Sequence, residues 1–256
     1  MAAAPVLEIV GSIGSTNAEM LDRLRSAEQP VENHWLIADR QTAGRGRLGR
    51  EWHDGAGNFM GSTAIVREPA DPPMQTLALV VGIAVFDAVA SLVPCSDGLA
   101  LKWPNDLHWR GAKLAGILVQ ASDNVAIVGV GINLRTAPSL PDRRTAALVE
   151  IGGTGDRDLV ARTVAVQVAR QVLVWRRSGF AAMTDAWLER GPAAQTPIIV
   201  SEASGNGVVS AGTGTSAGTT GTTGLFHGVA PDGALLLQMP DGTVRAVHSG
   251  EIEEGR

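Results

Sequence analysis

A chain of 256 residues, 45% of them hydrophobic, can bury a core as one large domain or as a medium domain with a small one. Its 21 basic and 26 acidic residues leave a net charge of −5, which disfavours nucleic acid and anionic membranes as general partners. A single cysteine, Cys95, excludes a disulfide framework and a cysteine-based metal site.

The first quarter of the chain predicts short strands at residues 5–10, 34–40 and 58–66. Between the first two strands, Ser15, Thr16 and Asn17 begin a helix, and Thr16 and Glu19 have the spacing of a capping box. Three consecutive hydrogen-bonding side chains exceed what one cap needs. They are therefore also candidates for binding a polar ligand head group.

The segment 41–52 alternates three glycines with three arginines directly after a strand. Glycines let main-chain N–H groups approach a ligand, and arginine forks suit carboxylate and phosphate, so the segment predicts an anion cradle. Its glycine spacing also fits a dinucleotide fingerprint, but no helix is expected to follow. A P-loop would need a lysine and a hydroxyl where Arg50 and Glu51 stand. A solvated basic turn remains the alternative.

Two lysines mark the next candidate segment. Residues 101–107 read as a strand end broken by proline that presents Lys102, Asn105 and Asp106 together, and a strand resumes at Lys113. The two segments predict a hairpin. Lys102 and Lys113 are the only lysines of the chain, so we expect both ammonium groups to face one cleft.

The remaining elements of the first 192 residues are mostly structural. Gly129 and Gly131 interrupt an apolar run at 125–133, which predicts a central strand that another group approaches closely. Residues 135–145, rich in proline and arginine, predict a mobile loop.

The apolar run at 74–86 is too short to span a membrane, and without a leader after Met1 we expect a cytoplasmic protein. Apolar spacing predicts helices at residues 72–94, 156–177 and 180–190. The histidines show no metal-ligand spacing and receive no catalytic role; they are His34, His53, His108, His227 and His248.

After residue 192 the pattern changes to a small all-β module, predicted at residues 193–256. A Gly/Ser/Thr stretch at 204–223 lacks the apolar surface to order itself and predicts a flexible insertion. Residues 1–192 form the other predicted domain. The expected strands of the module are residues 197–201, 224–229, 234–238 and 243–248.

Taken in order, these motifs resemble the biotin–protein ligases, in the monofunctional form without an N-terminal DNA-binding domain. About ten residues precede the helix at Ser15, too few for a helix-turn-helix, so no DNA binding is expected. The resemblance implies an α/β fold, with a mixed sheet flanked by helices as in class II aminoacyl-tRNA synthetases and a C-terminal SH3-like barrel. The motifs that carry it are residues 15–17, 41–52, 102–106, 113–117 and 129–133.

The resemblance also implies a two-step reaction. Biotin and ATP, with Mg²⁺, give biotinyl-5′-AMP and pyrophosphate, and a lysine of a biotin carboxyl carrier protein domain then takes the biotinyl group. Loops 41–57 and 135–147 are expected to order over the intermediate and exclude water. A monomer or a weak homodimer, with no membrane partner, is expected.

By resemblance, each motif receives a role. Lys113, Arg45 and Arg47 are the expected catalytic cations, and Asp106 is expected to orient the incoming lysine or to hold metal. Biotin binding is implied for Ser15, Thr16, Asn17, Gln41, Arg45, Gly46, Arg47, Lys113 and Gly116. ATP binding is implied for Arg45, Arg47, Arg50, Trp52, Lys102, Asn105 and Asn133.

Two alternative functions stay open. A lipoate ligase or octanoyltransferase would share the catalytic fold, but the polar set Ser15, Thr16, Asn17 and Gln41 suits a ureido ring better than an apolar tail. A non-catalytic nucleotide- or RNA-binding module would use the arginines only as phosphate anchors. The net charge and the paired lysines count against that module.

Overall fold

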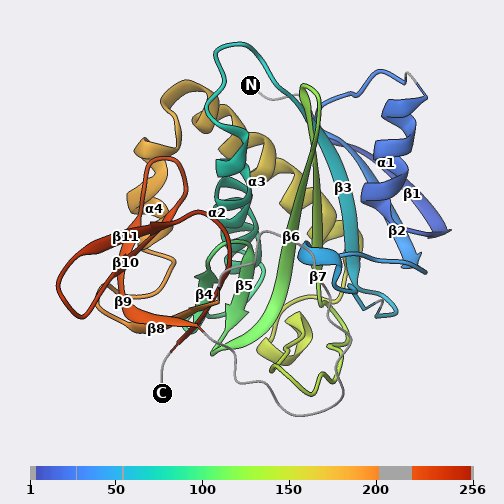
Figure 1. Cartoon of the computed structure of the whole chain (residues 1–256). Coiled ribbons are helices and arrows are strands. Elements are labelled where there is room, and N and C mark those ends of the chain that lie inside the picture. Colours follow the sequence, from blue (N-terminus) through green and yellow to red (C-terminus); the bar gives the residue numbers. More distant parts are fainter. Residues whose placement is uncertain (1–3, 27, 54, 202–220, 255–256) are drawn as a thin grey trace, which may run out of the picture.

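The computed structural model describes residues 4–26, 28–53, 55–201 and 221–254. Its strands form a seven-stranded mixed sheet in the order β1-β2-β3-β7-β6-β5-β4 and a five-stranded antiparallel sheet in the order β11-β10-β9-β8-β12 (Figure 1). The strands of the first sheet are β1 (Val6–Ile13), β2 (His34–Gln41), β3 (Phe59–Val66), β4 (Leu99–Lys102), β5 (Asp106–Trp109), β6 (Ala112–Ser122) and β7 (Val125–Ile132). Those of the second are β8 (Pro197–Ser201), β9 (Thr222–Val229), β10 (Leu235–Gln238), β11 (Val244–Val247) and β12 (Glu251–Glu254).

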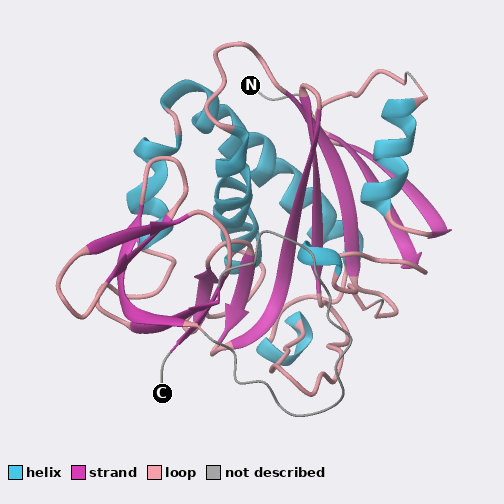
Figure 2. Ribbon diagram, viewed as in Figure 1, coloured by secondary structure: helices cyan, strands magenta, loops and turns pink. Residues whose placement is uncertain are grey.

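Helices cover both faces of the larger sheet (Figure 2). The apolar helices α2 and α3 pack side by side on one face and bury the main core, while α1 packs on β3 and β7 from the other face. No helix in the described ranges is long and apolar enough to cross a membrane. The helices are α1 (Thr16–Arg25), α2 (Leu77–Ala90), α3 (Arg157–Ser178) and α4 (Thr184–Leu188), and the 3₁₀ turns are η1 (Arg47–Gly49), η2 (Met74–Thr76), η3 (Leu148–Ile151) and η4 (Phe180–Met183).

The alternation of side chains along β7 explains which face of the sheet leaves space for a ligand. In β7, Val128, Val130 and Ile132 point into the core beneath α2 and α3, so Gly129 and Gly131, which alternate with them, point to the opposite face. The facing position of β6 is also a glycine, Gly116, which pairs with Gly131. These three glycines on neighbouring strands leave room for a ligand on the α1 side of the sheet.

The second sheet packs against the end of the first one. The indole N–H of Trp103 donates to the carbonyl of Gly233 at 3.1 Å, and Phe226 lies 6.3 Å from Trp187 between ring centroids. Buried residues of both sheets belong to one continuous core. The two sheets agree with the α/β fold and the C-terminal β module expected from the sequence, while the boundary at residue 192 stays a prediction.

The local predictions differ from the structure in three places. The capping box is wrong: Ser15 is the N-cap and makes no side-chain cap bond, and the N–H of Thr16 donates to the side chain of Gln41 instead. The helix predicted at 180–190 divides into η4 and α4. Strand β12 was not predicted. Most of the expected insertion at 204–223 lies outside the described residues, and β9 already begins at Thr222.

Candidate functional site

A cavity of about 280 Å³ lies over β6 and β7, on the face where the glycines leave room. The motifs that the sequence singled out come together here from distant parts of the chain. Of the predicted site residues, the lining includes Ser15, Thr16, Asn17, Gln41, Arg45, Gly46, Arg47, Arg50, Trp52, Asn105, Lys113, Gly116 and Asn133. Lys102 and Asp106 are not in the lining and lie next to it, behind Lys113.

One end of the cavity is a buried network of neutral polar groups. Oε1 of Gln41 accepts from the N–H of Thr16 at 2.7 Å and from its hydroxyl at 3.1 Å. The hydroxyl of Ser62 on β3 lies 2.7 Å from that of Thr16 and donates to Oδ1 of Asn17 at 2.6 Å. Because Nδ2 of Asn17 donates to Oε1 of Gln120 at 2.9 Å, the orientation of the Asn17 amide is fixed.

Two members of this network, Ser62 and Gln120, were missed by the sequence reasoning. Each lies within a strand, where a single polar residue usually faces solvent. The only available signal was their alternation: Ser62 shares the face of Ala64, opposite the core residues Phe59 and Ile65, and Gln120 follows Val119, so both point to the cavity face. A donor and acceptor pattern of this kind suits a small polar ring that needs matched partners once buried.

Trp52 forms a wall of the cavity by lying against the two glycines. A Cβ at Gly116 would be 3.0 Å from its ring, and a Cβ at Gly131 would overlap the ring. Two main-chain hydrogen bonds hold the loop before Trp52. The N–H of Gly46 donates to the carbonyl of Arg50 at 2.7 Å, and the N–H of Trp52 donates to the carbonyl of Gly44 at 3.0 Å. The prediction of a close approach to β7 is confirmed. Asn17 occupies the equivalent space over Gly129.

The other end of the cavity is cationic. Nζ of Lys113 lies 2.7 Å from Oδ2 of Asp106 and 5.8 Å from the centre of the Trp52 ring. Burial opposes ionisation of Asp106, but the charge of Lys113, with a smaller effect from His108, holds the pKa of that carboxyl well below its usual range. Lys113 therefore faces the cavity as the partner of a firmly ionised carboxylate.

Lys102 lies opposite Asp106 on the neighbouring strand. Burial lowers the pKa of its ammonium group, and the charges of Asp106 and Glu253 oppose that effect. Asp106 on β5 therefore lies between Lys102 on β4 and Lys113 on β6. We expected both amines to face one cleft, but only Lys113 lines the cavity, and Lys102 lies behind it beside Asp106.

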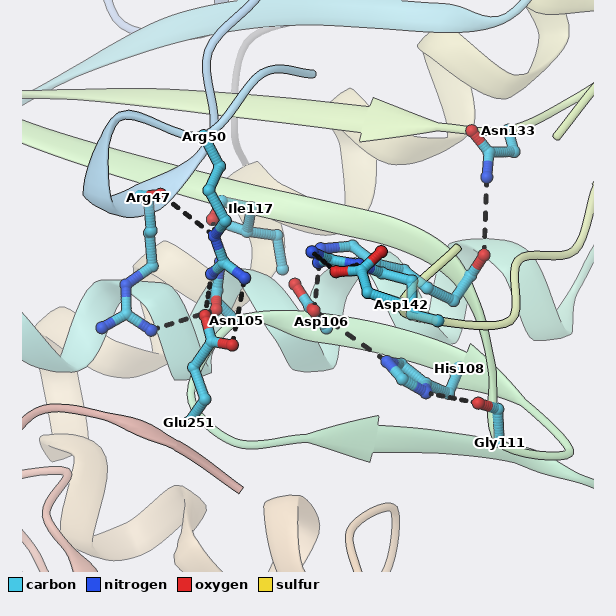
Figure 3. Close-up of polar contacts among 12 residues, drawn as sticks. Arg47, Arg50, Asn105, Asp106, His108, Gly111, Ile117, Asn133, Asp142 and Glu251 are labelled. Carbon is cyan, nitrogen blue, oxygen red and sulfur yellow. Dashed lines mark hydrogen bonds and ion pairs between the residues drawn. The ribbon is translucent and has the colours of Figure 1, made fainter. Parts of the chain in front are cut away.

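Two arginines of the glycine-rich loop contact the second sheet (Figure 3). Arg47 donates to Oδ1 of Asn105 at 3.2 Å and to the carbonyl of Gly250 at 3.4 Å, and Arg50 pairs with the carboxylate of Glu251. Burial lowers the pKa of Arg47, against the attraction of Asp106. Arg45 is exposed at the rim. The solvated-turn alternative does not fit these contacts, and η1 is too short for a dinucleotide-binding helix.

The loop after β7 is anchored at its start by Asn58. Oδ1 of Asn58 accepts from the N–H groups of Leu134 at 2.9 Å and Arg135 at 3.1 Å, and Nδ2 donates to the carbonyl of Thr136 at 2.8 Å. Asn133 lines the cavity, but its amide donates to the carbonyl of Ala146 at 3.2 Å. Asn133 therefore ties the two ends of this loop together.

Comparisons with known proteins identify the family. Residues 10–136 match the Biotin/lipoate A/B protein ligase family, and residues 213–254 match the Biotin protein ligase C terminal domain. A biotin--[acetyl-CoA-carboxylase] ligase of Paracoccus denitrificans is 33% identical over 239 residues, which cover 89% of this chain and 92% of that protein. The chain belongs to the biotin protein ligase family.

Other members of the biotin protein ligase family are also similar. A biotin--[acetyl-CoA-carboxylase] ligase of Mycobacterium tuberculosis is 38% identical over 67% of this chain and 66% of its own length. The biotin protein ligase of Aquifex aeolicus, solved with biotin and ATP, has a TM-score of 0.77 at 26% identity and covers 98% of this chain and 99% of that one. The family and the fold class predicted from the motifs are confirmed.

Proposed function

We propose that this chain joins biotin to ATP to form biotinyl-5′-AMP and pyrophosphate, and then transfers the biotinyl group to a lysine of a biotin carboxyl carrier protein domain. One observation carries the proposal: a single cavity has a neutral hydrogen-bonding end at Thr16, Asn17 and Gln41 and a cationic end at Lys113 and Arg47. Biotin has matching ends, a ureido ring and a carboxylate. Family membership supports the same reaction.

The roles follow from the chemistry at each end. Ser15, Thr16, Asn17 and Gln41 bind the ureido ring. Arg45, Arg47 and Lys113 hold the carboxylate against the α-phosphate, where two negative groups must be brought together. A preorganised donor aimed at the developing charge lowers the barrier by about 3–4 kcal/mol. Gly46 and Gly116 let the ligand approach the main chain, while Arg50, Trp52, Asn105 and Asn133 serve the nucleotide. Lys102, which does not line the cavity, acts on the nucleotide only through its positive charge.

Mg²⁺ enters in this proposal with ATP and not as a resident ion. In the described part of the chain, the carboxylates that line the cavity are Glu51 and Asp142, and no cluster of three metal-ligating side chains occurs there. Mg²⁺ commonly relies on one or two carboxylates together with substrate phosphates, so the residues fit a MgATP substrate. Since Lys113 occupies Oδ2 of Asp106, we assign Asp106 to the incoming lysine and not to the metal.

The closing of the loops completes the proposal. A mixed anhydride such as biotinyl-5′-AMP is destroyed by water, so loops 41–57 and 135–147 order over it until the carrier arrives. We propose the cytoplasm as the place of the reaction. The chain acts there as a monomer or a weak homodimer.

Mass spectrometry of a carrier domain tests the reaction. After incubation with the chain, biotin and MgATP, we expect the carrier to gain one biotinyl group. A carrier whose acceptor lysine is replaced by arginine is the matched control and should gain nothing. A second incubation, with lipoic acid in place of biotin, tests the alternative that the chain is a lipoate ligase. Transfer of lipoate in preference to biotin would favour that alternative. A chain that releases no pyrophosphate from ATP in the presence of biotin would contradict the proposal.

A further inference from the structure

His108 lies two residues after Asp106 on β5, and no role proposed above uses it. Residues i and i+2 of a strand share a face, which directs the ring toward the carboxylate. The side chain is only 13% exposed. Figure 3 shows the ring between the carboxylate of Asp106 and the carbonyl of Gly111.

The two ring nitrogens of His108 face different partners. Nδ1 lies 3.2 Å from the carbonyl oxygen of Gly111, and a carbonyl can only accept, so Nδ1 carries a proton. In the neutral ring Nε2 is then an unprotonated acceptor. It is buried, has no hydrogen-bond partner among the described residues, and lies 3.9 Å from Oδ2 of Asp106. A proton added to Nε2 would turn two facing acceptors into a donor and an acceptor.

In the role proposed above, Asp106 takes up a proton from the incoming lysine, and its surroundings oppose keeping that proton. The cations that interact with its carboxylate are Lys113 on β6, Lys102 on β4, Arg47 in the glycine-rich loop and Arg143 in the loop after β7. All four stabilise the ionised form. A carboxylate that accepts a proton in this environment must pass it to a second group, and the unprotonated Nε2 of His108 faces it at 3.9 Å.

The transfer half-reaction releases such a proton. The acceptor lysine enters as a neutral amine, after losing one proton to water, and its nitrogen attacks the carbonyl carbon of biotinyl-5′-AMP. The C–N bond forms, the C–O bond to phosphate breaks, and AMP leaves with that electron pair. The nitrogen must lose a second proton to become an amide. This step rests on the function proposed above.

We propose that His108 accepts this second proton through Asp106, so that the Asp106 carboxylate is restored within the same turnover. The imidazolium then returns the proton to water as AMP departs. His108 acts through Asp106 and does not touch the substrate, so it is a positioning residue. Adenylate formation releases no proton from an amine, so it should not depend on His108.

Separate assays of the two half-reactions test this role. In His108→Asn the side-chain amide can still donate to the carbonyl of Gly111, but no second nitrogen can accept a proton. We expect pyrophosphate release to stay within about twofold of the wild type, and transfer from preformed biotinyl-5′-AMP to the carrier to slow about 10- to 100-fold. His108→Gln, which places a non-basic amide toward Asp106, should give the same separation if His108→Asn folds poorly.

The pH profile of transfer distinguishes proton acceptance from packing. A protonated imidazole ring cannot accept a proton, so wild-type transfer should fall as the pH is lowered. The variants should lose the part of this dependence that comes from His108 and keep only the part that comes from deprotonation of the acceptor lysine. His248→Asn, at a site 70% exposed on the second sheet, is the control that should keep the whole dependence. Equal loss of both half-reactions, or an unchanged pH profile in the variants, would overturn the role of His108. A wild-type chain without either half-reaction would instead overturn the proposed function.

Discussion

Nζ of Lys113 lies 2.7 Å from Oδ2 of Asp106, and the two side chains are only 17% and 18% exposed. The carboxylate fixes the ammonium group at the cationic end of the cavity. A guanidinium is planar and larger, and it cannot occupy the same point beside Gly116 and the Trp52 ring. The position of Lys113 is therefore specific to an ammonium group.

Lys113→Arg should abolish most adenylate formation without unfolding the chain. Losing one well-aimed cation at a developing charge slows a reaction about 100- to 1000-fold. Pyrophosphate release in the presence of biotin measures the effect, and the thermal melting temperature checks the fold. Arg25→Lys, at an exposed helix end, is a control that should change neither quantity. Undiminished pyrophosphate release in Lys113→Arg would remove Lys113 from the catalytic cations.

Asp106→Asn should destabilise the fold in a pH-dependent way. The pKa of Asp106 is lower in the fold than in the unfolded chain, so its ionised form stabilises the fold above the ordinary carboxyl range, near pH 3.9. That contribution is lost as the pH falls toward the folded-state pKa. Removing one partner of the mostly buried pair should cost about 2–3 kcal/mol at pH 7. Urea unfolding at pH 7 and at pH 3 should show a smaller difference at the lower pH, and an equal difference would contradict the pairing.

Gly131→Ala should weaken ligand binding by displacing Trp52. The added Cβ overlaps the indole ring, which must move into the cavity or away from β7. We expect the affinity for biotin or MgATP to fall at least tenfold, about 1.4 kcal/mol, in isothermal titration calorimetry. Gly11→Ala is the matched control, because its Cβ meets no atom within 4 Å. Wild-type affinity in Gly131→Ala would show that the position of Trp52 does not matter for binding.

Asn58→Ala should loosen the loop after β7. Asn58 is buried, and its loss leaves the N–H groups of Leu134 and Arg135 without their acceptor. Unsatisfied buried groups cost about 1–3 kcal/mol, so we expect a loss of stability in this range and faster amide exchange at residues 134–136. Asn124→Ala, in the exposed turn between β6 and β7, should change stability by no more than about 0.5 kcal/mol. Unchanged exchange in Asn58→Ala would mean that other contacts hold the loop.

Arg50 and Glu251 should show a small coupling across the two sheets. Their side chains are 37% and 38% exposed, so solvent screens the pair and the coupling free energy should not exceed about 1 kcal/mol. The measurement is a double-mutant cycle of Arg50→Ala and Glu251→Ala, read as KM for MgATP. Because Arg50 is also a proposed nucleotide ligand, the single Arg50 change should raise KM more than the Glu251 change does. Additive effects would mean that the contact between the sheets does not influence nucleotide binding.

The sequence predicts most of this fold because its signals are local. Alternation and turn residues locate the strands, and a glycine inside a strand, as at Gly131, indicates a close neighbour without naming it. The contacts of Ser62, Gln120 and Glu251 join residues 45, 103 and 201 positions apart, and no local pattern encodes such pairs. The capping-box prediction was wrong for the same reason, because the N–H of Thr16 donates to the side chain of Gln41, which is 25 positions away.

The placement of the lysines has a practical consequence. Both ε-amines of the chain belong to the site, one lining the cavity and the other partly buried behind it, while every other basic side chain outside histidine is arginine. Reagents that modify primary amines, such as activated esters, would find no lysine elsewhere on the enzyme. Protection of Lys113 from such a reagent by biotin or nucleotide would then report occupancy of the site directly, in unlabelled protein.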